Sequence, residues 1–89
     1  MDYSSLLNAL KVDLGLTAKV YDERLNMIIK AAVEAIEEEG ILLGDSAQDQ
    51  NLVLMYAAWL WRKRDSGDGM PRMIRYALNN RLFAQRSRG

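Results

Sequence analysis

Apolar residues recur every three or four positions along most of the chain, a spacing that predicts α-helices rather than strands. The first predicted helix has apolar residues on one side, at Tyr3, Leu6, Leu7, Leu10 and Leu14. Ser4 or Ser5 can serve as its N-cap residue, and Gly15 is a natural helix stop.

The second predicted helix begins between Thr17 and Asp22, which are both plausible caps, and ends before Gly40. Its apolar residues gather on one side, so we expect an amphipathic helix. The opposite side is mainly acidic and carries Glu23, Lys30, Glu34, Glu37 and Glu38.

The third predicted helix begins after Ser46, which with Asp49 forms a weak variant of the capping box, and continues to about Arg64. Residues 52–61 are apolar on all sides, so this helix should lie at the centre and be covered by several neighbours. The run has ten residues, well short of the roughly 20 that a helix needs to cross a bilayer. We therefore expect a core helix and no membrane contact.

A turn at residues 66–69 separates the third helix from a fourth, which has Pro71 in its first turn and runs to about Gln85. One side of this helix is apolar, with Met70, Ile74, Ala77, Leu78 and Leu82. Arg81 points into this apolar side, so it should extend to solvent or pair with a carboxylate that the sequence does not identify.

The other side of the fourth helix is basic and aromatic. It carries Arg72, Arg75, Asn79 and Arg86, with Tyr76 and Phe83 beside them. Together these patterns predict one all-α domain over residues 1–89, a small bundle of about four helices around a central hydrophobic helix.

Composition adds two constraints to this picture. A chain of 89 residues buries a modest core, and without cysteine it has no disulfide to support that core, so association with other chains is a natural supplement. The net charge is zero, but residues 1–50 hold ten acidic and four basic residues, whereas residues 51–89 hold two acidic and eight basic ones. This asymmetry favours a charged partner or the packing of unlike faces on each other.

The residue types argue against catalysis. The chain lacks histidine and cysteine, the most common general base and thiol nucleophile. Glu37, Glu38 and Glu39 are consecutive on a helix and cannot converge on one ligand. Asp65 and Asp68 match only a fragment of a calcium loop. We predict no catalytic residue, cofactor or metal.

The basic, aromatic stretch between Ala57 and Phe83 leaves two classes of partner open. Its arginines could neutralise phosphates while Trp59, Trp61, Tyr76 or Phe83 stacks or packs nearby, as in a nucleic-acid binder. Arginine and aromatic residues are also enriched at protein interfaces, and the pI of about 6.2 is low for a dedicated DNA-binding protein.

Three stretches of the sequence, "LNALKVDLGLT", "YDERLNMIIKAAVEAIEEEGI" and "LVLMYAAWLWRKRDSGDGMPRMIRYALNNRLFAQRSR", resemble the head-tail connector (head completion or adaptor) proteins of long-tailed bacteriophages and prophages. The resemblance implies a structural protein at the head-tail junction of the virion, which is assembled in the host cytoplasm and forms a homo-oligomeric ring. It would dock on the portal protein once DNA is packaged and offer a platform to a downstream tail-joining protein. Non-specific contact with the packaged DNA would accompany this role.

The alternative is a small helical DNA-binding module of the helix-turn-helix type that takes part in DNA packaging. If the chain forms a ring, the helical faces predict a subunit interface between an acidic and a basic side. Its residues would be Glu23, Glu34, Glu37, Glu38, Arg72, Arg75, Tyr76, Phe83 and Arg86.

Overall fold

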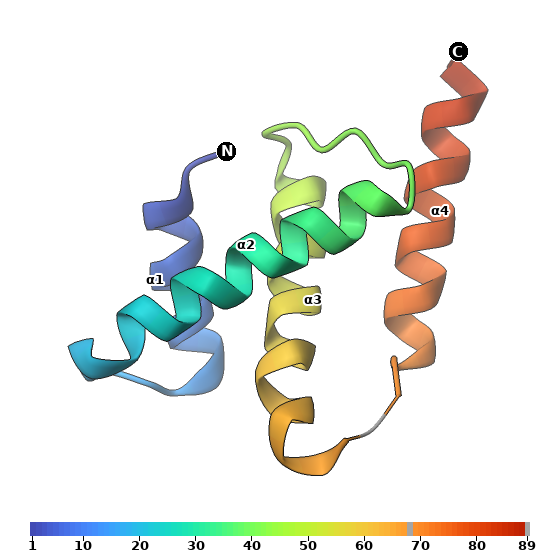
Figure 1. The fold of residues 1–89 in the computed structure, drawn as a ribbon. Coiled ribbons are helices and arrows are strands. Elements are labelled where there is room, and N and C mark those ends of the chain that lie inside the picture. Colours follow the sequence, from blue (N-terminus) through green and yellow to red (C-terminus); the bar gives the residue numbers. More distant parts are fainter. Residues whose placement is uncertain (68, 89) are drawn as a thin grey trace.

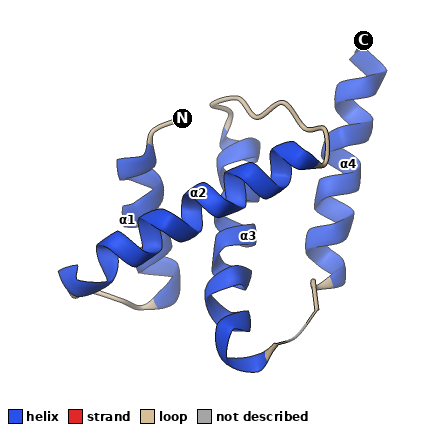
Figure 2. Ribbon diagram, in the orientation of Figure 1, coloured by secondary structure: helices blue, strands red, loops and turns tan. Residues whose placement is uncertain are grey.

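The computed structural model describes residues 1–67 and 69–88, and it is all-α over these ranges, as predicted. The helices are α1 (Tyr3–Leu14), α2 (Asp22–Glu38), α3 (Ala47–Ser66) and α4 (Arg72–Arg88), and the short 3-10 helix η1 (Lys19–Tyr21) leads into α2. Figure 2 shows these helices joined by loops. Asp68, which belongs to the predicted turn and to the calcium-loop fragment, lies outside the described residues.

α3 is the central helix of the fold. It packs against α1, α2 and α4, while α2 crosses obliquely over α1 and α3 (Figure 1). α4 runs beside α3, and its C-terminal end projects beyond the rest of the bundle (Figure 1). The predicted central position of the apolar helix is therefore confirmed.

The buried side chains form one cluster to which all four α-helices contribute. Leu25, Ile29, Ala32 and Ile36 line the inner side of α2 at helical spacing, as the amphipathic pattern predicts. The remaining buried apolar residues are Leu6, Leu10, Ile41, Leu52, Val53, Tyr56, Ala57, Ala58, Ile74 and Leu78.

The helix ends differ from the sequence predictions in detail. The N-cap of α1 is Asp2 and not Ser4 or Ser5: its carboxylate accepts hydrogen bonds from the backbone N–H groups of both serines, at 3.0 and 3.3 Å. A carboxylate also interacts favourably with the positive end of the helix dipole. α3 and α4 extend to Ser66 and Arg88, slightly beyond their predicted ends.

Two glycines set the chain direction after α1 and α2. Gly15 ends α1 with a φ of 70°, and Leu16 donates its N–H to the carbonyl of Lys11 at 2.9 Å, so the predicted stop is confirmed. Gly40 has a φ of 97°, and a Cβ there would lie 3.7 Å from a methyl carbon of Leu82 in α4. Glycine at position 40 thus turns the chain where α2 approaches α4.

We expect Ile29→Ala to lower the free energy of unfolding by about 2 to 5 kcal/mol, because the side chain is fully buried between helices and its removal leaves a cavity. Leu42→Ala is the control, because Leu42 is 75% exposed and its truncation should change the free energy of unfolding little. Urea unfolding followed by circular dichroism measures both. Equal effects of the two substitutions would contradict the packing described here.

Candidate interaction surface

α4 is attached to the bundle by few apolar contacts and several polar ones. Only Ile74 and Leu78 are fully buried among its described side chains. Gln85 supplements them by accepting the N–H of Leu42 at 2.7 Å and donating to the carbonyl of Gly40 at 2.9 Å. The loop after α2 is therefore bonded directly to α4.

Arg81, which lies on the apolar side of α4, pairs with the carboxylate of Asp49. Its Nε donates to Asp49 at 2.6 Å, and one terminal nitrogen donates both to Asp49 at 3.1 Å and to the carbonyl of Leu42 at 2.7 Å. Asp49 is only 3% exposed and also accepts the N–H of Gly44 at 2.7 Å. This buried pair joins α3, α4 and the intervening loop.

Asp49 does not complete the predicted capping box in full. Its N–H donates to the Ser46 hydroxyl at 3.1 Å, so Ser46 is the N-cap residue, as expected. Its carboxylate, however, turns to Arg81 and Gly44. The hydrogen bond from Arg81, with further help from that of Gly44, lowers the pKa of Asp49 despite the opposing effect of burial.

Asp49→Asn should lower the free energy of unfolding by about 3 kcal/mol, because it leaves the guanidinium of Arg81 without its counter-charge. It should also reduce the acid sensitivity of the fold. The pKa of Asp49 in the folded chain lies below its ordinary value of 3.8, so its stabilising effect is present above that pH and is lost as the pH falls below it.

Urea unfolding at a series of pH values between about 6 and 2 measures both effects. Asp2, whose pKa is lowered mainly by its hydrogen bonds with Ser5, leaves a residual slope in the variant. If the parent and Asp49→Asn lose stability in parallel on acidification, the pair does not have this role.

The outer side of α4 is exposed and combines large apolar side chains with arginines. Tyr76 is 58% exposed and Phe83 is 74% exposed, which is unusual for side chains of this size. Arg72 and Arg86 flank them and are exposed too, with no ion-pair partner among the described residues. We call these four residues the α4 face.

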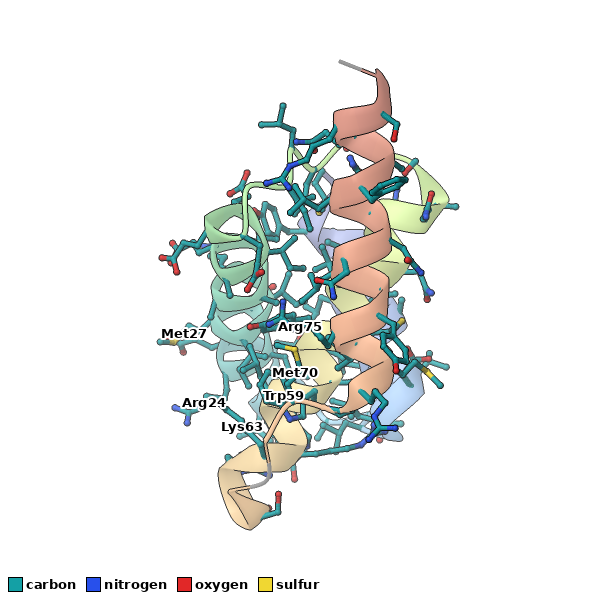
Figure 3. The ribbon with its side chains drawn as sticks, turned by 90° about the vertical axis from the view of Figure 1, so that its right-hand side faces the viewer. Arg24, Met27, Trp59, Lys63, Met70 and Arg75 are labelled. Atoms are coloured by element: carbon teal, nitrogen blue, oxygen red, sulfur yellow. The ribbon has the colours of Figure 1, made fainter. Side chains whose placement is uncertain are left out.

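Arg75, which the sequence places on the same basic side, has a partner within the chain. Its guanidinium donates to both carboxylate oxygens of Glu39, at 3.0 and 3.4 Å, and so bridges α4 to the end of α2. Figure 3 shows Arg75 directed toward α2 rather than outward. The charge of Arg75 is therefore balanced within its own chain, without the predicted contact to another subunit.

The outer side of α2 is exposed as well. Glu23, Glu34, Glu37 and Glu38 are all at the surface, and none has an ion pair within the part of the chain that the structure describes. The two sets of residues predicted for a subunit interface thus lie on different helices. Apart from Arg75, their side chains are exposed and can contact another subunit.

The two tryptophans already have cationic partners in their own chain. The ammonium of Lys63 lies 4.7 Å from a ring centroid of Trp59, and the guanidinium carbon of Arg64 lies 3.8 Å from that of Trp61 (Figure 3 shows the first pair). Tyr56 and Tyr21 approach Trp59 and Trp61 edge-on, at 5.3 and 5.9 Å. The basic, aromatic end of α3 therefore packs largely on itself.

A groove of about 460 Å³ lies along the side of α3 between α1 and α4. Apolar residues dominate its lining, including Leu54, Met55 and Met73, with Asp13 and Arg62 also present. Neither this groove nor the rest of the described chain gathers three carboxylates in a group that could hold a metal ion. In addition, no described helix is long and apolar enough to cross a bilayer.

No family model matches the chain, and comparisons with curated proteins and with solved structures found no match.

Proposed function

We propose that the chain is a structural adaptor of the head-tail connector type, which forms a ring, docks on the portal protein and receives a tail-joining protein. The observation that carries this proposal is the α4 face, where Tyr76 and Phe83 stand exposed between Arg72 and Arg86. Aromatic side chains with neighbouring arginines are the residue types that contribute most to protein interfaces. A small domain without disulfides also gains stability by burying such a face against another chain.

The charge distribution supports a head-to-tail contact between copies. The α4 face is basic, whereas the outer side of α2 is acidic, and the two lie on different helices. A contact between two different faces of identical subunits repeats from copy to copy and closes into a ring if the rotation permits. The sequence resemblance to ring-forming connector proteins agrees with this type of contact.

The alternative of a DNA-binding module receives less support from the arrangement. Lys63 and Arg64 each cover a tryptophan face, so these faces are not free to stack on bases. Arg75 and Arg81 are engaged with Glu39 and Asp49. In addition, α3 and α4 run side by side in a hairpin, which differs from the steep crossing of a helix-turn-helix (Figure 1).

Assembly provides the test of the proposed function. We expect the purified chain to form oligomers as its concentration rises and to bind the portal protein encoded by the same genome. Tyr76→Ala combined with Phe83→Ala should weaken assembly strongly, because the aromatics supply most of the contact. Val20→Ala combined with Leu42→Ala is the matched control, since it removes two apolar side chains of similar exposure elsewhere. Native mass spectrometry resolves the species.

A chain that stays monomeric at all accessible concentrations and does not bind the portal protein would refute the adaptor proposal. If the control variant loses assembly as strongly as the double aromatic variant, the α4 face is not the contact.

We expect duplex DNA to bind weakly and without sequence preference, because only exposed cations such as Arg62, Arg72 and Arg86 can contact phosphates. The logarithm of the binding constant should then fall linearly with the logarithm of salt concentration. Fluorescence anisotropy with two unrelated duplexes measures this. Sequence-selective binding that persists at physiological salt would favour the DNA-binding alternative.

A further inference from the structure

The outer side of α2 contains one feature that the acidic pattern alone does not explain. Met27 is 60% exposed and lies on the same side as the glutamates. Figure 3 shows Met27 and Arg24 pointing away from α4 of the same chain. The exposed part of this apolar side chain is available to another molecule.

The charges on α2 and α4 have matching spacings. Fourteen residues separate Glu23 from Glu37, and fourteen also separate Arg72 from Arg86. At 1.5 Å per residue each pair spans about 21 Å along its helix. Two helices placed side by side can therefore align both arginines with both glutamates at once.

We propose that α2 of a neighbouring copy covers the α4 face, with the two helices antiparallel. In this register Arg72 lies against Glu37 of the next copy. Arg86 lies against Glu23. This inference rests on the proposed ring, and it specifies which surface of the second copy makes the contact.

The residues between the charged ends decide the direction of the helices. In the antiparallel arrangement Phe83 meets Met27, and the hydroxyl of Tyr76 can donate a hydrogen bond to Glu34. In the parallel arrangement the charged ends match equally well, but Phe83 would lie on the carboxylate of Glu34 and leave it without a donor. Placing an apolar ring on a carboxylate costs desolvation energy without compensation. The antiparallel order also brings opposite ends of the helix dipoles together.

Lys30 is the cation in the middle of the acidic side, and the register accommodates it. Lys30 lies seven residues from both Glu23 and Glu37, and Asn79 lies seven residues from both Arg72 and Arg86. The lysine therefore faces a neutral amide and not an arginine. Opposite charges therefore meet at both ends of the contact, and Lys30 in the middle meets no cation. This pattern provides specificity.

Disulfide trapping tests this register directly, because the parent has no cysteine. Ser87 is exposed at the end of the α4 face and lies nearest Glu23 in the antiparallel order and nearest Glu38 in the parallel order. We compare Ser87→Cys with Glu23→Cys against Ser87→Cys with Glu38→Cys. Both variants lose one hydroxyl and one carboxylate, so each is the control for the other.

Under mild oxidation the variant Ser87→Cys with Glu23→Cys should give a ladder of covalent oligomers on a non-reducing gel, since a disulfide needs Cβ atoms about 3.5 to 4.5 Å apart. The variant Ser87→Cys with Glu38→Cys should remain mainly monomeric. A ladder from the second variant alone overturns the antiparallel order, and a ladder from neither overturns the contact.

Charge reversal provides an independent check. Arg72→Glu with Arg86→Glu should weaken assembly by about a hundredfold, because like charges then face each other across the contact. Adding Glu23→Arg and Glu37→Arg to the same chain should restore it. If the four-residue variant does not recover, the register is wrong. If the unmodified parent does not assemble at all, the proposed ring fails as well, so the two failures are distinguishable.

Discussion

The buried pair between Asp49 and Arg81 fixes the position of α4. Among its described side chains this helix contributes two fully buried ones to the core, so apolar packing holds it less firmly than it holds α2 or α3. The pair compensates by joining α4 to α3 and to the carbonyl of Leu42 within one set of hydrogen bonds. Both carboxylate oxygens of Asp49 accept hydrogen bonds, which offsets the desolvation cost of burying its negative charge.

The same attachment explains why the outer side of α4 is exposed. Polar contacts of Arg75, Arg81 and Gln85 help to hold the inner side of the helix, so its outer side chains are not needed to attach it to the bundle. Tyr76 and Phe83 are therefore presented on a helix that is already folded and attached, so a partner that covers them need not order the backbone. The end of α4 projects beyond the bundle, where a second molecule can reach it (Figure 1).

Much of the fold could be predicted from local patterns in the sequence. Helical spacing of apolar residues gave the four helices, Gly15 marked a helix end, and the all-apolar run at residues 52–61 indicated the central helix. The cap at Asp2 was missed because the two serines that follow are equally good cap residues.

Contacts between distant residues could not be predicted in the same way. The position of Arg81 in an apolar side required a carboxylate, but Asp49 lies 32 residues earlier and looked like part of a helix cap. The pairing of Arg75 with Glu39 across 36 residues depends on how α2 and α4 approach each other, which no local pattern reports. Helical spacing places Met27 on the same side of α2 as Glu23 and Glu34, but only the fold shows that this side stays uncovered and leaves Met27 60% exposed.

We propose that identical subunits meet through α4 of one copy and α2 of the next. A cryo-electron microscopy reconstruction of the assembled particle would show this contact. We expect a closed ring in which the α4 face of each subunit, with Tyr76 and Phe83, is buried against the neighbour's Met27 and its flanking glutamates. A ring in which the α4 face is open to solvent, or in which subunits meet through the groove beside α3, would contradict it.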